Sequence, residues 1–252
     1  MKFQVIGLLN LALLATPLIS AAQPYQIEAE ANIARTSLDF DAGDFDSNLF
    51  TLSARYYLAP VETVGPWTES AFLQKSSSAG VSLSRSGGDI SGDTDFSIDA
   101  FYVTPEDLIV GGELSSDDVT DIAVFGGLYL DDKTTAIARI SIGDADSIGL
   151  EYKTLRQLAS GNDLTVEANV ALVDAADTGF EIGGSGVYFL SDQLGVLGGL
   201  SYQDIGDFDV FTLSSGAEYF LSETLAVNGG LSLGFGDSVD TTSFFIGVLG
   251  RF

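Results

Sequence analysis

Acidic side chains dominate the residues of this sequence that could do chemistry. The 252-residue chain contains 36 Asp and Glu residues against ten Lys and Arg, and it has neither His nor Cys. Ser-His-Asp and Cys-His catalysis and the usual zinc and transition-metal ligand sets are therefore missing. Paired carboxylates such as Glu28 and Glu30 remain as acid–base candidates, but neighbouring positions on one strand face are better explained as a polar lining. We expect neither an enzyme nor a cofactor.

Short clusters of Asp, Gly and Ser recur along the chain, and two of the densest are DFDAGDFDSN (39–48) and SGGDISGDTD (86–95). Several closely spaced oxygen ligands would suit Ca²⁺, but the loop length and closing Glu of an EF-hand are missing. Asp is also favoured in turns, where its side chain bonds to nearby backbone groups. We therefore predict solvated turns and no metal site, with weak divalent bridging to lipopolysaccharide phosphates as a softer hypothesis.

The first 22 residues are predicted to be a secretory signal peptide, followed by a single domain over 23–252. A lysine precedes an apolar run from Val5 to Leu14, and small residues surround the expected cleavage site. An N-terminal anchor helix is the alternative. Asn10 and Pro17 disfavour it, because they interrupt a run that is already shorter than the ~20 apolar residues of a membrane span.

Loss of the signal peptide would remove Lys2 and leave nine basic against 36 acidic residues, a net charge of −27. Such a charge argues against nucleic acid as a partner, since neutralising phosphates requires Lys and Arg. The hydrophobic fraction of 46% and the mean hydropathy of +0.28 argue against disorder. An exported chain without cysteine has no disulfides, so sheet pairing or lipid must stabilise it.

Apolar and polar residues alternate from Tyr25 onward, as in YQIEAEANI (25–33), LTVEANVAL (164–172) and LAVNGGLSLGF (225–235). A period of two indicates strands whose two faces meet different surroundings. Six short turns that follow an aromatic strand end alternate with seven Asp-rich connections, which gives 14 strands; 12 are possible if two weak neighbours are misread. The expected strands are 25–35, 47–58, 69–85, 93–103, 107–115, 119–129, 134–143, 147–157, 163–173, 178–190, 194–203, 208–220, 224–235 and 241–252.

A closed, antiparallel, up-and-down transmembrane β-barrel of the all-β class accounts for this pattern. An open meander leaves two unpaired edges, and in lipid an unpaired backbone group has no water to bond. A secreted β-sandwich or solenoid is the alternative, but the many Gly and Ala residues on the apolar face would pack a soluble core thinly. Aromatic strand ends are expected to form an interfacial girdle at one rim: Tyr56, Tyr57, Tyr102, Tyr129, Tyr188, Phe189, Tyr219 and Phe220.

The segment RYYLAPVETVGPWTESAFLQKSSSAGVSLS (55–84) resembles the early part of a family of general porins of Gram-negative outer membranes. An aromatic strand end (Tyr56–Tyr57) is followed by a Pro-Val turn (60–61), a Gly-Pro pair (65–66) and a Glu-x-Ala-Phe-Leu start to the next strand (69–73). The resemblance implies a barrel in the cell outer membrane of a Gram-negative bacterium. It says less about the solute.

The terminal strand resembles the C-terminal signal of outer-membrane proteins, with Phe252 at the end and apolar residues at alternate positions before it. The signal residues are Phe244, Ile246, Val248 and Phe252, with Gly250 a departure. The resemblance implies that barrel-assembly machinery recognises Phe252 at the periplasmic rim. We also expect this strand to pair with the first one and close the barrel.

The charged residues on the polar face are predicted to line a pore: Glu28, Glu30, Arg55, Asp99, Glu113, Arg139, Glu151, Lys153, Glu167, Glu181 and Glu218. Their acidic excess favours cations, and no connection looks long enough to fold inward as a plug. We predict a porin for passive transport of small hydrophilic solutes or ions, embedded in outer-membrane lipid and lipopolysaccharide. The alternative is a non-conducting structural or adhesive barrel that presents acidic extracellular loops. The oligomeric state is left open.

Overall fold

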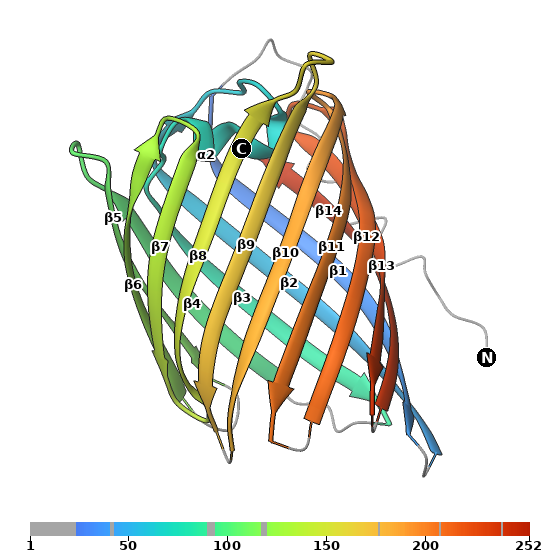
Figure 1. Ribbon diagram of the computed structural model, residues 1–252. Helices are drawn as coiled ribbons and strands as arrows, with labels where there is room; N and C mark the ends of the chain where they lie inside the picture. Colours follow the sequence, from blue (N-terminus) through green and yellow to red (C-terminus); the bar gives the residue numbers. More distant parts are fainter. Residues whose placement is uncertain are drawn as a thin grey trace.

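In the computed structural model, a closed antiparallel barrel of 14 strands is formed by the described residues, which are 24–40, 43–89, 94–116, 120–175, 177–206, 208–237 and 239–252 (Figure 1). The predicted signal peptide lies outside the described residues, as do parts of both Asp clusters, 41–42 and 90–93. Each strand pairs with its neighbours in the sequence, and β14 pairs with β1 to close the barrel. No helix in the described ranges has the length and apolar character to cross a membrane.

The strands are β1 (Tyr25–Phe40), β2 (Gly43–Val61), β3 (Ser78–Gly88), β4 (Thr94–Val103), β5 (Leu108–Ser116), β6 (Thr120–Asp131), β7 (Thr134–Ile142), β8 (Asp146–Gln157), β9 (Asp163–Asp174), β10 (Thr178–Ser191), β11 (Leu194–Ile205), β12 (Phe208–Ser222), β13 (Leu225–Gly236) and β14 (Val239–Arg251). Both termini of the barrel and the turns after even-numbered strands lie at one end, which we call the terminal end. The connections after odd-numbered strands lie at the opposite, Asp-rich end.

The two faces of the wall differ as the alternation predicts. On β8, Ile148 and Leu150 are 56% and 60% exposed on the outer face, whereas Glu151 and Lys153 contact inward-facing groups. Large apolar side chains are similarly exposed on every strand. Bare apolar surface over a whole closed sheet is stable only against acyl chains, because in water it would drive aggregation. The prediction of a 14-stranded membrane barrel is confirmed.

The third predicted strand, 69–85, is wrong over its first half. Residues Trp67–Glu69 form a 3-10 helix (η1), Ser70–Leu73 form a helical turn (α2), and β3 begins only at Ser78. Pro66 precedes the helix with φ −60°, a value that suits a helix start and that its ring fixes. The Glu-x-Ala-Phe-Leu motif therefore starts a helix in this chain, and not a strand.

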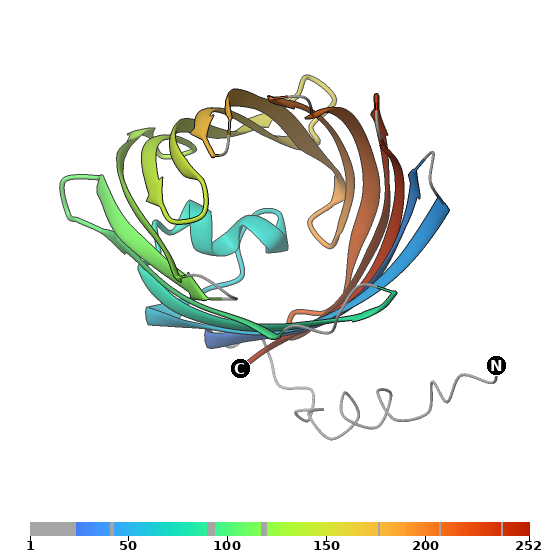
Figure 2. The same cartoon turned by 90° about the horizontal axis from the view of Figure 1, so that it is seen from below.

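The connection between β2 and β3, residues 62–77, folds into the barrel, and we call it the luminal segment. Figure 2 shows its helical turns inside the ring of strands. Gly65 adopts φ +59°, which allows the sharp reversal before Pro66, and a Cβ there would lie 2.8 Å from Leu73 Cδ1. The expectation that no connection could fold inward is therefore wrong, because a helical turn packs more chain into the lumen than an extended loop of equal length.

Candidate functional site

The centre of the luminal segment is attached to the wall through Glu69. Its carboxylate lies 2.8 Å from Lys153 Nζ on β8 and accepts a hydrogen bond of 3.0 Å from Thr165 Oγ1 on β9. Glu69 is 3% exposed. A carboxylate this deeply buried is stable only when paired, so Lys153 and Thr165 fix the position of the segment.

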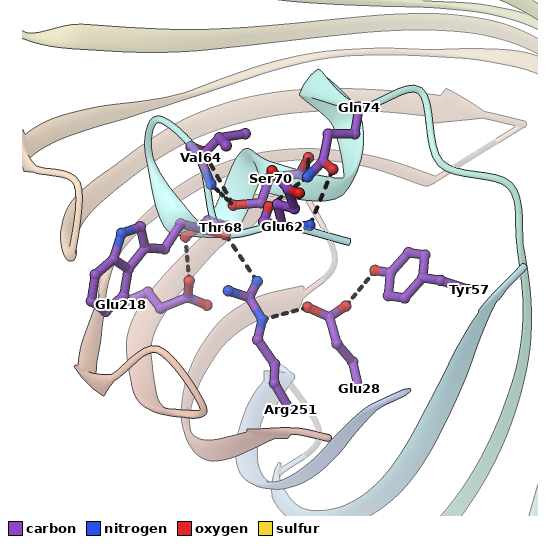
Figure 3. Close-up of polar contacts among 10 residues, drawn as sticks. Glu28, Tyr57, Glu62, Val64, Thr68, Ser70, Gln74, Glu218 and Arg251 are labelled. Carbon is purple, nitrogen blue, oxygen red and sulfur yellow. Dashed lines mark hydrogen bonds and ion pairs between the residues drawn. The ribbon is translucent and has the colours of Figure 1, made fainter. Parts of the chain in front are cut away.

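Arg251 holds the Trp67 end of the segment. Figure 3 shows the Arg251 side chain between Glu28 and the luminal segment. Its Nη2 donates a hydrogen bond of 2.9 Å to the Trp67 carbonyl, and its Nε donates one of 2.8 Å to Glu28. Arg251 is 2% exposed. The last residue of β14 therefore binds both the first strand and the luminal segment.

Two aromatic rings cover the buried guanidinium. Its central carbon lies 4.4 Å from the ring centroid of Tyr25 and 4.5 Å from that of Phe220. Trp67 packs edge-on against Phe220, and its backbone N–H donates a hydrogen bond of 2.8 Å to the Asp192 carbonyl in the β10–β11 turn. A planar, always charged guanidinium suits this stacked and multiply bonded position.

The other end of the segment reaches the turns beside β5 and β7. Phe72 stacks on Tyr129, whose hydroxyl donates a hydrogen bond of 3.1 Å to the Phe72 carbonyl. Lys75 Nζ lies 2.8 Å from Asp107 and 3.0 Å from Asp132. The hydrogen bonds to Asp107 and then Asp132 raise the pKa of Lys75, so the ammonium stays charged at neutral pH.

The predicted aromatic girdle is only partly right. Tyr56, Tyr102 and Tyr219 are exposed on the outer face, but Tyr57, Tyr129, Phe189 and Phe220 are buried on the inner one. Successive residues of a strand point to opposite faces, so Tyr56–Tyr57 and Tyr219–Phe220 cannot share a face. Of the inward rings, Tyr129 and Phe220 pack against the luminal segment itself.

Two adjoining cavities of about 570 and 600 Å³ lie between the segment and the wall. Phe72, Phe101, Tyr129 and Lys153 contact both. One extends along the charged strands β2–β8, and the other extends to Gly, Ser and Thr residues on β10–β12. Each volume is large enough for a small hydrophilic solute.

Seven of the eleven residues predicted to line a pore border these cavities: Arg55, Asp99, Glu113, Arg139, Glu151, Lys153 and Glu167. Arg55 lies 2.9 Å from Asp99, and Arg139 lies 3.0 Å from Glu113 and 3.3 Å from Glu151. The other four, Glu28, Glu30, Glu181 and Glu218, bond to Arg251, Asn228, Asn169 and Thr68. The eleven residues thus share the inner face, and their role as the lining of a conducting pore stays a prediction.

Sequence reasoning missed the luminal residues of the segment: Trp67, Thr68, Glu69, Phe72 and Lys75. A signal was available, because the consecutive apolar residues Ala71, Phe72 and Leu73 break the period-two alternation five residues after a Gly-Pro pair. The assignment of 69–85 to a strand gave Glu69 no separate role.

The chain end closes the sheet as expected. The Phe252 carbonyl accepts hydrogen bonds of 2.8 and 2.9 Å from the backbone N–H groups of Gln26 and Ile27, and its own N–H donates to the Ile27 carbonyl at 2.9 Å. Phe244 and Ile246 are exposed on the outer face, and Val248 is half-buried. Recognition of these side chains by assembly machinery stays a prediction.

Residues 8–141 match the model of a family described as "Putative general bacterial porin". The chain belongs to this porin family. It is accordingly an outer-membrane β-barrel protein of the Gram-negative cell envelope. No curated protein matches the porin in sequence.

Solved structures share the fold of this porin. The outer membrane protein Omp33 of Acinetobacter baumannii is 19% identical with a TM-score of 0.68, and the match covers 91% of this chain and 99% of Omp33. A bacterial polysaccharide outer membrane secretin is 8% identical with a TM-score of 0.53, over 89% of this chain and 98% of the secretin. At these identities the likeness concerns the barrel, and not the solute.

Proposed function

We propose that this porin is a passive diffusion channel for small hydrophilic solutes and that it prefers cations. The observation that carries the proposal is the charge of the inner face. On the wall, eight carboxylates of the described residues bond or border the lumen (Glu28, Glu30, Asp99, Glu113, Glu151, Glu167, Glu181 and Glu218), against four basic groups (Arg55, Arg139, Lys153 and Arg251). Within the luminal segment, Glu69 and Lys75 offset each other. A polar lining holds water, and an acidic excess raises the local cation concentration.

The luminal segment is the part of the molecule that would limit flow. It occupies the terminal end of the lumen and is bonded to β8, β9, β12 and β14. Solutes would therefore pass beside it, or when it moves away from the wall. We assign no catalytic role to any of these residues.

A closed structural barrel is the second candidate, and the attachment of the segment on all sides favours it. Liposome swelling separates the two candidates. Proteoliposomes in isotonic solutions of a pentose should swell, whereas those in a large neutral oligosaccharide should not. A variant in which residues 63–76 are replaced by a short Gly-Ser linker should swell faster.

Folding of both proteins would be checked by heat-dependent electrophoretic mobility. Swelling by the linker variant alone would support the closed barrel. Swelling by neither protein, although both are folded, would contradict the diffusion channel.

A further inference from the structure

The inward-facing carboxylates fall into two groups that differ in their partners. Five carboxylates of the wall contact a basic side chain: Asp99 contacts Arg55, Glu113 and Glu151 contact Arg139, Glu167 contacts Lys153, and Glu28 contacts Arg251. Each of these contacts is 3.3 Å or shorter. A close cation cancels most of the field of one carboxylate. Arg139 is shared by two carboxylates and Lys153 by Glu167 and Glu69, so each of these groups keeps one net negative charge, whereas Asp99–Arg55 and Glu28–Arg251 are neutral pairs.

Three carboxylates on the other side of the barrel have neutral partners only. Glu30 on β1 accepts a hydrogen bond of 2.7 Å from Asn228 Nδ2, Glu181 on β10 accepts one of 3.0 Å from Asn169 Nδ2, and Glu218 on β12 accepts one from the Thr68 hydroxyl. No Lys or Arg of the described ranges lies within 4.0 Å of any of the three. Their charge is therefore uncompensated at contact distance.

Glu30 and Glu218 lie together, at the level of the luminal segment. Asn228 is directly opposite Glu218 in the β12–β13 pair, and the same Asn228 donates to Glu30. Thr68, which bonds Glu218, belongs to the segment itself. The side chains of Glu30 and Glu218 are both half-buried, so water and ions in the lumen beside the segment reach them.

Two amide oxygens add to the negative character of this corner. Asn228 Oδ1 and Asn32 Oδ1 are buried and accept no hydrogen bond, and both lie over Gly247, where no side chain separates them. Oxygen acceptors without a donor create a potential that favours a cation and disfavours an anion. Glu181 is different, because it pairs with Gln203 and Ala171 near the Asp-rich end of β10, far along the strand from the segment.

We infer that Glu30 and Glu218 determine the ion selectivity of the channel and that the ion-paired carboxylates contribute less. This inference rests on the proposed function. Gln is the replacement for both residues, because it keeps an acceptor oxygen for Asn228 and for Thr68. The first control is Arg55→Gln/Asp99→Asn, which removes a whole ion pair and leaves the net charge of the lumen unchanged. The second control, Glu181→Gln, removes one charge from an unpaired residue away from the segment.

The test is the reversal potential of the refolded full-length protein in a KCl gradient across a planar bilayer. Glu30→Gln/Glu218→Gln should lower the ratio of K⁺ to Cl⁻ permeability by about threefold or more, as removal of most of the local field requires. Arg55→Gln/Asp99→Asn and Glu181→Gln should change the ratio by less than about 1.5-fold, since the first leaves the net charge unchanged and the second removes a charge far from the segment. Heat-dependent mobility would confirm that each variant is folded.

Three outcomes would count against the inference. A cation-selective wild type whose selectivity survives in the double variant overturns this inference alone. A loss in Glu181→Gln about half as large as that in the double variant also overturns it, because total lumen charge would then set the selectivity. A folded wild type that carries no current, or has no preference for K⁺, overturns the proposed function together with the inference.

Discussion

The ammonium of Lys153 lies 2.8 Å from a carboxylate oxygen of Glu69 and 2.9 Å from one of Glu167, so one cation joins the luminal segment to the barrel wall. The two carboxylates are not equivalent. The Glu69 side chain is almost fully buried, whereas half of the Glu167 side chain is exposed. Loss of Lys153 would therefore leave Glu69 as the uncompensated charge.

Lys153→Met should destabilise the segment strongly. A buried carboxylate that loses its cation costs about 3–5 kcal/mol, and only Thr165 would remain to bond Glu69. Glu69→Gln should cost less, about 1–2 kcal/mol, because the amide still accepts from Thr165 and Lys153 keeps Glu167. The chain has a single tryptophan, Trp67, so its fluorescence during urea titration of the refolded protein reports on the segment directly. Glu167→Gln is the control. If it lowered the stability of the segment as much as Lys153→Met does, the conclusion that Glu69 depends on Lys153 more than Glu167 does would be wrong.

Arg251→Lys should weaken the attachment of Trp67 although it keeps the charge. An ammonium cannot lie flat between the rings of Tyr25 and Phe220, nor bond Glu28 and the Trp67 carbonyl with a rigid fork. We expect the free energy of unfolding of the segment to fall by about 2–3 kcal/mol, because desolvated cation–π contacts and one charge-assisted hydrogen bond are lost. Arg35→Lys is the matched control, because Arg35 forms an exposed pair with Asp46 and its replacement should leave the stability nearly unchanged. Red-shifted Trp67 emission should accompany Arg251→Lys only; identical behaviour of the two variants would refute the role of stacking.

The number and order of the strands could be predicted from the sequence because alternation is a local property. A period-two pattern with turn residues at each end defines a strand whatever it pairs with, and lipid imposes the pattern on nearly every strand. The luminal segment could not be predicted in this way. Its helical turns are short, and Glu69, Phe72 and Lys75 are stabilised by hydrogen bonds to residues 32 to 96 positions away. Such contacts leave no local periodicity.

Gly247→Ala should impair closure of the barrel. A Cβ at Gly247 would overlap Asn32 Oδ1 from β1 and Asn228 Oδ1 from β13, which meet over this glycine. Overpacking of this kind costs about 1–3 kcal/mol. Closure of the barrel is measured as the fraction of protein that shows heat-dependent electrophoretic mobility after refolding into vesicles. Gly198→Ala is the control, since nothing lies within 4 Å of its added Cβ, and Asn32→Ala should rescue Gly247→Ala in part. Equal refolding yields of Gly247→Ala and Gly198→Ala would show that β14 has space for a Cβ at position 247.

The face on which a charged residue lies was easier to predict than the residue that it contacts. Alternation assigns Arg55 and Asp99 to one face, and register then brings them within 2.9 Å across the intervening Gly80. The contact between Glu218 and Thr68 needs the three-dimensional path of the luminal segment, which the sequence pattern does not contain. The aromatic girdle was over-assigned for a different reason, because it placed neighbouring residues such as Tyr56 and Tyr57 in one girdle although alternation puts them on opposite faces.

Phe252 should matter in two separable ways. Deleting it removes three backbone hydrogen bonds to Gln26 and Ile27, so both refolding in vitro and assembly in cells should fall. Phe252→Ala keeps those bonds and removes only the ring, so it should refold normally in vitro but reach the outer membrane poorly. Surface levels and refolding yields would be compared for both variants. Normal surface levels of Phe252→Ala would show that the ring is not the assembly signal.

The most direct test of the account is the current through the refolded protein in a planar bilayer with KCl at different concentrations on the two sides. The account predicts a stable ohmic current whose reversal potential is displaced toward the equilibrium potential of K⁺. No current despite a folded, heat-modifiable band, or a reversal potential at zero or toward that of Cl⁻, would contradict it.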